Sequence, residues 1–522
     1  METGVTESFK KKLIVIGNGM AGARTLEEIL ARGGADQFEI TVVGEEAYGN
    51  YNRLLLSSVL NGSQDPSGIF LNGLSWYVEH GIALRAGVRV DVIARPHKTI
   101  HCDDGNCFQY DKLIIATGSR PAIPPIAGLK MPNGEFRPGI FVFRTLDDCR
   151  KIAAYAAKCR RAVVIGGGLL GLEAARGLLN HGVEVHVIHL LGHLMEQQLD
   201  PQAGAILKHT IEAMGIQVHL KKLTKAVLDD DEVTGLAFED GATLKCDMIV
   251  IATGVTPNAE IGSRWGLNTE RGIVVDDQLR TSDPDIYAVG ECAQHRGRVY
   301  GLLAPLWEQA KVLADHITGT DCEAAYQGSK LATKLKVMGV ELASMGVVAA
   351  DGEEEDVVQF IEPKRGIYKK LIIRDGRLAG GIMIGDVSKA AYLMQVFDRG
   401  LRLPEERLSL LFDIGAPRAQ VTFDEMPDSV QICNCNGVSK EAIVQCVAGG
   451  KRTLEGVMEA TRACTGCGSC KTLVNELVEW ACKEQLREDP SLHIWRDEYE
   501  DERDAHLVND RVHRNIQDDR TF

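Results

Sequence analysis

The sequence predicts an α/β protein with two parallel-sheet domains, a small strand-rich α+β domain and a small helical domain. The first observation is a strand, glycine turn, helix and strand near residue 11, and the second is the return of this pattern near residue 161. The third is a group of seven cysteines between Cys433 and Cys482. With 522 residues, 45% of them hydrophobic and 25% charged, the chain is long enough for several globular domains.

The composition excludes several partners. The chain has 58 Lys and Arg residues against 73 Asp and Glu residues, which gives a net charge of −15. That charge disfavours nucleic-acid backbones and anionic membranes as partners. No apolar run approaches the roughly 18 residues of a membrane helix, and the run from Leu13 to Ile16 is too short for a signal peptide. We therefore expect a soluble, cytoplasmic protein that binds neither nucleic acid nor membrane.

Three glycines follow the first predicted strand, KKLIVIG, and open the first predicted helix: Gly17, Gly19 and Gly22. Glycines at this spacing permit a tight turn, let the backbone approach a pyrophosphate and allow close packing of helix on sheet. The helix N-terminus favours the anion. Glu45, at the end of the next strand, can accept hydrogen bonds from ribose hydroxyls. The spacing also occurs in plain tight turns, but the strand, helix and acid around it favour a dinucleotide site.

A second set of glycines repeats this arrangement between the strand RAVVIGGG and the helix LLGLEAARGLLNHG: Gly166, Gly168 and Gly171. Two dinucleotide sites in one chain imply two cofactors that exchange electrons, usually a flavin reduced by a nicotinamide. The following strand ends at His189, where a site that prefers NAD usually has a carboxylate. Either this imidazole tolerates a 2′-phosphate or the residue merely ends the strand, so the choice between NADH and NADPH stays open.

A third motif, TSDPDIYAVGE, ends in Gly290 and Glu291. It resembles the second FAD signature of the two-dinucleotide-binding flavoprotein reductases, in which Asp usually follows the glycine and binds the ribityl chain. Glu is one methylene longer, so the contact is expected to shift. With all three motifs, residues 1–325 resemble the FAD-dependent pyridine nucleotide oxidoreductase superfamily. The resemblance implies two Rossmann-like dinucleotide-binding domains, with an NAD(P)H domain (121–254) inserted into an FAD domain (1–120 and 255–325).

The resemblance assigns roles to further residues. Two pairs match the crossover between the domains: Thr117-Gly118 and Thr253-Gly254. Arg53 matches a flavin-proximal Arg of the rubredoxin-reductase-like branch, and Glu173 matches a Glu near the nicotinamide, although its position also fits an exposed helix residue. Residues 23–101 contain no cysteine, which excludes the dithiol relay of the superfamily's disulfide reductases. Electrons must therefore leave the flavin by another route.

Beyond residue 325 the pattern changes twice. Residues 326–415 alternate apolar and polar side chains around an Asp-Gly turn, which predicts antiparallel strands in a small α+β domain. Residues 416–430 are a proline-bearing linker, and residues 486–522 form a polar tail that we expect on the surface.

Four cysteines carry the metal prediction: Cys433, Cys435, Cys467 and Cys470. A C-x-C pair and a C-x2-C pair supply four thiolates, which suit a [2Fe–2S] cluster or a tetrahedral zinc, with free thiols as a third interpretation. The segment CNCNGVSKEAIVQCV…TRACTGCGSC resembles the bacterioferritin-associated ferredoxin domain, which implies a [2Fe–2S] cluster in a helical module over 428–485. Cys464 is interpreted as a non-ligand neighbour that could stand in as a ligand, and Cys446 as a packing residue.

The chain as a whole resembles the N-terminal electron-input half of the assimilatory NAD(P)H-dependent nitrite reductase large subunit. The match includes NYNRLLLSS, HLMEQQLDP, TSDPDIYAVGECA and the cysteine module. It implies electron flow from NAD(P)H through FAD and [2Fe–2S] to a sirohaem/[4Fe–4S] centre that reduces nitrite to ammonium. Only Cys482 follows Cys470, so that centre is absent from this chain. We expect one partner of a split enzyme or a piece of a longer one, and a homo-oligomer stays open.

Two other functions remain open from the sequence. One is a reductase that feeds a nitrate reductase, a rubredoxin or a ferredoxin. The other is a redox sensor or scaffold that binds FAD and metal without turnover.

Overall fold

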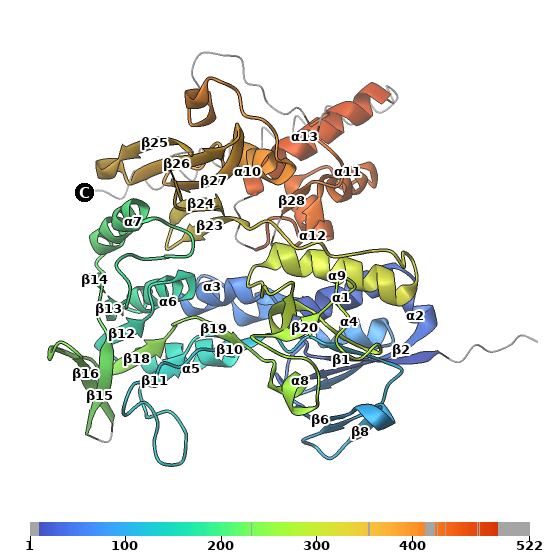
Figure 1. The fold of residues 1–522 in the computed structure, drawn as a ribbon, viewed down its shortest axis with the longest axis horizontal. Helices are drawn as coiled ribbons and strands as arrows, with labels where there is room; N and C mark the ends of the chain where they lie inside the picture. Colours follow the sequence, from blue (N-terminus) through green and yellow to red (C-terminus); the bar gives the residue numbers. More distant parts are fainter. Residues whose placement is uncertain are drawn as a thin grey trace, which may run out of the picture. The chain divides into compact units, whose positions relative to one another are not determined.

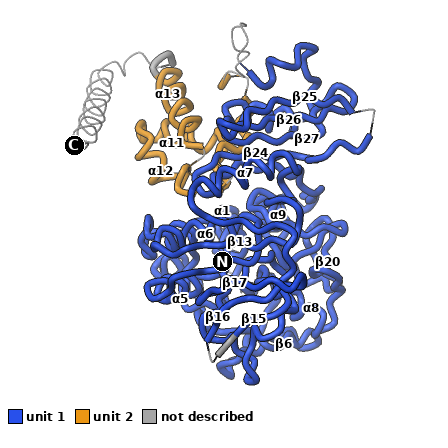
Figure 2. Tube along the Cα trace, turned by 90° about the vertical axis from the view of Figure 1, so that its left-hand side faces the viewer, with its two compact units in different colours: residues 1–418 blue, residues 419–522 orange. Residues whose placement is uncertain are grey.

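The computed structural model describes residues 10–230, 232–352, 355–412, 423–424, 426–433, 435–466, 468 and 470–488. The chain divides into two compact units, residues 1–418 and 419–522, which Figure 2 draws in blue and orange. Cys467, most of the predicted linker and the predicted tail beyond Glu488 lie outside the described residues. Within the part that is described, no helix is both long and apolar enough to cross a bilayer.

The first sheet of the larger unit is parallel and five-stranded, in the order β21-β9-β1-β2-β5. Apart from the edge strand β5, its strands are short and largely buried, as parallel sheets between helices require. The last strand returns to this sheet after the second sheet has formed, which makes that sheet an insertion. The strands are β1 (Lys11–Ile16), β2 (Phe38–Gly44), β5 (Ala83–Ala86), β9 (Lys112–Ile115) and β21 (Ile286–Ala288).

Helices α1 (Met20–Ala31) and α9 (Leu303–Thr318) lie side by side against this sheet (Figure 1). The smaller elements around it are α2 (Gly34–Gln37), α4 (Leu74–Glu79), α8 (Glu260–Arg264), β3 (Asn50–Tyr51), β4 (Phe70–Asn72), β6 (Val90–Ala94), β7 (Thr99–Cys102), β8 (Cys107–Gln109), β20 (Ile273–Val275) and β22 (Ala293–His295). Helix α3 (Leu56–Leu60) packs instead against the inserted domain.

The inserted sheet is also parallel and five-stranded, in the order β11-β18-β12-β13-β14. Thr145 and Asp148 form a capping box that starts α5, and Asp200 caps α7 ahead of Pro201. The elements are α5 (Leu146–Ala156), α6 (Leu169–Asn180), α7 (Pro201–Ala213), β11 (Ile140–Val142), β12 (Arg161–Ile165), β13 (Glu184–Ile188), β14 (Gln217–His219) and β18 (Met248–Ile251), with an antiparallel sheet of β15 (Thr224–Asp230), β16 (Glu232–Phe238) and β17 (Thr243–Lys245).

The two predicted crossover segments run next to each other. β10 (Ser119–Pro121) and β19 (Val255–Pro257) form an antiparallel ladder. The Thr117 hydroxyl donates to the Asn258 carbonyl at 2.8 Å, and the Thr253 hydroxyl donates to the Ala122 carbonyl at 2.7 Å. The chain therefore leaves and re-enters the first domain through one paired strand connection.

Five strands between Ala332 and Ile384 form the antiparallel sheet that the sequence predicts, in the order β23-β24-β27-β26-β25. The Asp-Gly turn joins β26 to β27, and both of its residues have positive φ, +53° at Asp375 and +69° at Gly376, as a type I′ hairpin requires. The elements are β23 (Ala332–Val337), β24 (Val340–Gly346), β25 (Asp356–Glu362), β26 (Ile367–Arg374), β27 (Arg377–Ile384) and α10 (Ala390–Arg399).

This sheet is tied to the inserted domain at the start of α7. The Tyr368 hydroxyl donates to Oδ2 of the buried Asp200 carboxylate at 2.5 Å, and Lys370 Nζ donates to the same oxygen at 2.9 Å. The Ser344 hydroxyl also donates to the Gln198 carbonyl at 2.8 Å. A buried carboxylate satisfied by two side chains of β26 holds the two domains together more strongly than a surface ion pair would.

Lys369, on β26, is buried at 1% exposure and forms an ion pair with Asp386 at 2.6 Å. Burial alone would raise the pKa of Asp386, but hydrogen bonds from Lys369 and Ser388 outweigh it and hold the pKa at about 2. A carboxylate whose pKa is lower in the folded state stabilises the fold above its ordinary pKa and loses that contribution as the pH falls through the folded value.

We therefore expect Asp386→Asn to destabilise the protein at pH 7 and to have a progressively smaller effect as the pH falls from about 4 to about 2. The measurement is urea unfolding of both proteins at several pH values, with Asp375→Asn, in the exposed turn, as the control. A penalty that stays constant down to pH 2 would contradict this assignment.

The smaller unit is helical around a short hairpin. Ser439 and Thr453 cap the first two helices through their side chains. Cys446 packs partly buried against the core of this unit, in agreement with its interpretation as a packing residue. The elements are β28 (Gln431–Cys433), β29 (Val438–Ser439), α11 (Lys440–Ala448), α12 (Leu454–Thr461) and α13 (Lys471–Glu488).

Candidate functional site

The first glycine turn connects β1 to α1. Gly17 has φ +109°, and a Cβ added there would lie 2.2 Å from the Ala116 carbonyl oxygen. A Cβ on Gly22 would lie 2.2 Å from the Gly17 carbonyl oxygen, whereas a Cβ on Gly19 would meet nothing within 4 Å. Gly17 and Gly22 are therefore required by packing, while Gly19 faces open space at the N-terminus of α1.

The second glycine turn, between β12 and α6, has the same geometry. Gly166 has φ +124°, and its Cβ would lie 2.1 Å from the Ala252 carbonyl oxygen. The Cβ of Gly171 would lie 2.0 Å from the Gly166 carbonyl oxygen, and that of Gly168 would again meet nothing within 4 Å. Neither α1 nor α6 has a side-chain cap or an acid in its first turn. Both turns thus leave backbone N–H groups for an anion, and both fit a dinucleotide pyrophosphate.

The two acids at the end of β2 have different surroundings. Glu45 is exposed directly after the strand, where a ribose is expected. Glu46 accepts a hydrogen bond from the Tyr51 hydroxyl at 2.5 Å and forms an ion pair with Arg53. Burial alone would lower the pKa of Arg53, but the charges of Glu46 and Glu291 outweigh it and raise that pKa. Arg53 therefore stays charged at every working pH.

Glu291 is close enough to raise the pKa of Arg53 through its charge, although the two residues are 238 positions apart in the sequence. Its carboxylate pairs with Arg144 and accepts from the Ser119 hydroxyl at 2.5 Å. Arg53 Nη1 in turn donates to the Arg144 carbonyl at 3.1 Å. A Cβ on Gly290 would lie 2.7 Å from Cβ of Ala21, so this turn packs directly on α1. Because the group contains Arg53, which is predicted to lie near the flavin, we name it the flavin-side cluster; its members are Glu46, Tyr51, Arg53, Ser119, Arg144 and Glu291.

Arg144 was not among the residues predicted from the sequence. It follows β11 and stands directly before Thr145, the cap of α5. An Arg between a strand and a helix cap is the only local signal, and it does not distinguish a buried ion pair from a surface residue. Its role becomes visible only through its contacts with Glu291 and Ser119.

Removal of the Arg144 charge is expected to destabilise the fold because it leaves Glu291 largely buried without its cation. We expect Arg144→Met to lower the free energy of unfolding by about 3 kcal/mol, and Arg144→Met/Glu291→Gln to recover most of that loss. Urea unfolding of the wild type, both single variants and the double variant measures the coupling. Strictly additive effects would show that the pair does not interact.

Glu173, on α6, is not the exposed helix residue that was its alternative interpretation. Its carboxylate accepts from the Met338 backbone N–H at 2.9 Å, at the tip of the β23–β24 hairpin. Burial raises the pKa of Glu173, and hydrogen bonds from Met338 and Ser57 oppose that rise. The residue therefore joins α6 to the hairpin and to α3, and its approach to the nicotinamide stays a prediction.

His189 does more than end β13. The imidazole is 6% exposed, its Nδ1 accepts from the Gly167 N–H at 3.1 Å, and its Nε2 lies 3.2 Å from Oε2 of Glu196. A Cβ on Gly167 would lie 2.8 Å from Cγ of His189, so the ring packs against the glycine turn. His189 thus supports the second glycine turn. The choice between NADH and NADPH stays untested.

In the smaller unit, two predicted metal ligands come together. The side chains of Cys433 and Cys470 are hydrogen bonded to each other, and the backbone N–H of Cys464 is hydrogen bonded to both sulfurs. Cys435 lies just after β28 and packs against the same core. Cys467 is outside the described residues, and no group of three or more metal-ligating side chains occurs among the residues that are described. Adjacent thiols that receive backbone N–H donors fit an iron–sulfur cluster.

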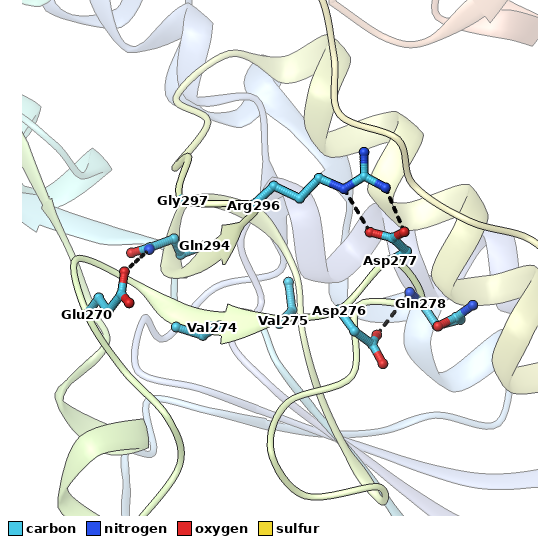
Figure 3. Close-up of a pocket in the computed structure, with 9 residues that line it drawn as sticks. All are labelled: Glu270, Val274, Val275, Asp276, Asp277, Gln278, Gln294, Arg296 and Gly297. Carbon is cyan, nitrogen blue, oxygen red and sulfur yellow. Dashed lines mark hydrogen bonds and ion pairs between the residues drawn. The ribbon is translucent and has the colours of Figure 1, made fainter.

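An open groove of about 560 Å³ lies elsewhere in the larger unit, beside β20 (Figure 3). Its polar side chains bond to each other: Arg296 pairs with Asp277 at 2.7 Å, and Gln294 donates to Glu270 at 2.5 Å. No predicted site residue lines it, and we assign it no ligand.

Three family models match the chain. The model described as pyridine nucleotide-disulphide oxidoreductase matches residues 11–312, which is more than half of the chain. The model of the rubredoxin NAD+ reductase C-terminal domain matches residues 332–400. The model of the BFD-like [2Fe-2S] binding domain matches residues 431–480.

Two relatives from Bacillus subtilis are similar over most of the chain. One is named nitrite reductase [NAD(P)H]; it is 39% identical over an alignment that covers 98% of this chain and 69% of the relative. The other is named assimilatory nitrate reductase electron transfer subunit; it is 40% identical, with 90% of this chain and 60% of the relative covered. The chain thus spans only part of either relative's length.

A chain in the crystal structure of the covalent putidaredoxin reductase–putidaredoxin complex has the same fold. The TM-score is 0.69 at 23% identity, and the match covers 77% of this chain and 98% of that one. Together with the two parallel sheets described above, this match confirms the predicted fold class.

Proposed function

We propose, from the premise that this chain belongs to the pyridine nucleotide-disulphide oxidoreductase family, that it is the electron-input part of an NAD(P)H-dependent nitrite reductase. The chain is an NAD(P)H-dependent flavoprotein oxidoreductase, and its predicted cofactors, FAD, NAD(P)H and [2Fe–2S], are those that the family models imply. When bound, FAD supplies the conversion of a two-electron hydride into single electrons, which a [2Fe–2S] cluster carries one at a time.

One observation carries the proposal: the same chain holds two glycine turns of matching geometry and a pair of adjacent thiols under backbone N–H donors. We assign FAD to residues 1–120 and 255–325 and NAD(P)H to residues 121–254. The turn at Gly19 and the exposed Glu45 would hold the FAD pyrophosphate and ribose, and the turn at Gly168 would hold the NAD(P)H pyrophosphate. The chain's own groups bind, orient and neutralise charge, and no step requires a protein general base.

The flavin-side cluster supports this assignment. It lies at the carboxyl ends of the first sheet's strands, where α/β folds bind their ligands. Arg53 and Arg144 place two cations there, and Glu46 and Glu291 balance them. Such a paired set can hold polar flavin atoms without leaving a net charge buried beside the ring.

We propose that the physiological acceptor is a sirohaem/[4Fe–4S] nitrite reductase subunit or domain, located outside this chain, and that the site of action is the cytoplasm. The similarity to the nitrite reductase relative over 98% of this chain supports the acceptor. A homo-oligomer is compatible with this role. A second candidate, electron supply to an assimilatory nitrate reductase, is favoured by the 40% identity to the electron transfer subunit.

The test uses the purified full chain. We expect NADH or NADPH to bleach the flavin, to produce the EPR signal of a reduced [2Fe–2S] cluster, and to drive nitrite reduction once a sirohaem nitrite reductase subunit is added. Electron delivery to a nitrate reductase, without delivery to the sirohaem subunit, would favour the second candidate. A chain that binds FAD and metal yet reduces no dye with NAD(P)H would instead be a sensor or scaffold.

A further inference from the structure

The loop between α12 and α13 has an unusual backbone. Arg462 has φ +60° and Cys464 has φ +63°, so two residues with side chains adopt the left-handed conformation within three positions. Each such residue costs on the order of 1 kcal/mol and persists only where surrounding contacts enforce it. Arg462 is the left-handed C-cap that ends α12, so the conformation that calls for a reason in the metal site is that of Cys464, shortly before the C-x2-C pair.

Asn436 supplies the enforcing contacts. This side chain follows the C-x-C pair, is 8% exposed, and donates from Nδ2 to the Arg462 carbonyl at 2.5 Å and to Oγ1 of Thr465 at 3.0 Å. The Thr465 hydroxyl donates to the same Arg462 carbonyl at 2.8 Å. Asn436 thereby links the loop of the first cysteine pair to the loop of the second.

We interpret these contacts of Asn436 as fixing the direction of the Cys464 backbone N–H. The Cys464 N–H is hydrogen bonded to the sulfurs of both Cys433 and Cys470, while the Cys464 thiol lies 3.5 Å from Sγ of Cys470. Either the backbone or the thiol of Cys464 could therefore serve the site. A [2Fe–2S] cluster takes four cysteine ligands, and hydrogen bonds to those sulfurs help to set its potential.

We propose that Cys464 serves the cluster through its backbone N–H and not through its thiol, and that Asn436 is the positioning residue that keeps this N–H aimed at the two sulfurs. The inference rests on the proposed [2Fe–2S] site. It gives the left-handed conformation of Cys464 a role in the metal site.

The experiment compares iron content, the EPR spectrum after reduction, the cluster's midpoint potential and the rate of iron loss to a chelator in full-length variants. Cys464→Gly keeps the N–H and adopts positive φ without strain. We expect it to retain two irons per chain, the wild-type EPR spectrum and the wild-type potential. Loss of iron or a changed spectrum in Cys464→Gly, with FAD content preserved, would show that the thiol is a ligand and overturn the proposal.

Asn436→Ala tests the positioning role. We expect a more negative midpoint potential and iron loss about 10-fold faster than in the wild type, in line with outer-shell changes at metal sites. Asn475→Ala is the control, since Asn475 lies on α13 of the same unit and donates to Glu479 on the same helix. Equal potentials and rates in Asn436→Ala and the wild type would overturn the positioning role. A wild-type chain with no reduced [2Fe–2S] signal would overturn the proposed function itself, and the inference with it.

Discussion

Cys433→Ser and Cys470→Ser are each expected to abolish the [2Fe–2S] cluster and to reduce electron delivery to a sirohaem partner by at least about 100-fold, since outer-shell changes alone cost 10–100-fold. The reason is ligand chemistry: a serine hydroxyl is a hard ligand that stays protonated, whereas iron in these clusters requires soft thiolates. Both cysteines also receive the Cys464 N–H, which a shorter hydroxyl would no longer meet.

The flavin end of the chain should be unaffected by these substitutions, because the glycine turns belong to the other compact unit. We therefore expect NADH to bleach the flavin at the wild-type rate while the EPR signal of the reduced cluster is missing. Cys446→Ser is the matched control, a cysteine of the same unit on α11 that packs against its core. A variant at Cys433 or Cys470 that still holds two irons with an unaltered spectrum would remove these residues from the ligand set.

Gly168→Val is expected to raise the KM for NAD(P)H by about 100-fold, equivalent to about 2.7 kcal/mol of binding, with little change in melting temperature. Gly168 has φ −83° and ψ −178°, which any residue adopts, and a Cβ there meets no atom within 4 Å. The new side chain would fill the open space at the N-terminus of α6, where the pyrophosphate is expected to bind. The substitution therefore acts on the ligand and not on the fold.

Gly171→Ala is the comparison variant, because it is expected to affect the fold and not the ligand. Its Cβ would lie 2.0 Å from the Gly166 carbonyl oxygen, so this smaller change is expected to lower the melting temperature. The two variants are compared by thermal unfolding and by steady-state kinetics with NADH and NADPH. If Gly168→Val unfolded as readily as Gly171→Ala, or if its KM stayed at the wild-type value, the open space would not be the nucleotide site.

The glycine turns could be predicted from the sequence because their requirement is local. A strand that turns sharply into a helix leaves no room for a Cβ at the first and last glycine, and the six residues of the G-x-G-x-x-G motif are enough to show this requirement. The antiparallel domain was predictable for a similar reason, since an Asp-Gly pair between alternating strands selects one hairpin type. Neither prediction needs knowledge of distant contacts.

The flavin-side cluster could not be predicted in full. Its members come from five separate segments, and only the completed sheet brings Arg144 to Glu291. The orientation of His189 toward Gly167 depends in the same way on packing. The left-handed conformation of Cys464 is opposed by its residue type, so no propensity rule indicates it. Such features follow from tertiary contacts that override local preference.

The paired crossover strands have a mechanical consequence. An inserted domain on a single flexible linker would rotate freely, but here β10 and β19 must bend together. A second attachment joins Asp200 of the inserted domain to Tyr368 and Lys370 of the antiparallel β23–β27 sheet. A body restrained at two separated points has little freedom to rotate. We therefore expect the architecture of the larger unit to hold the spacing between the two glycine turns, so that the proposed hydride donor and acceptor meet without a hinge-driven closure.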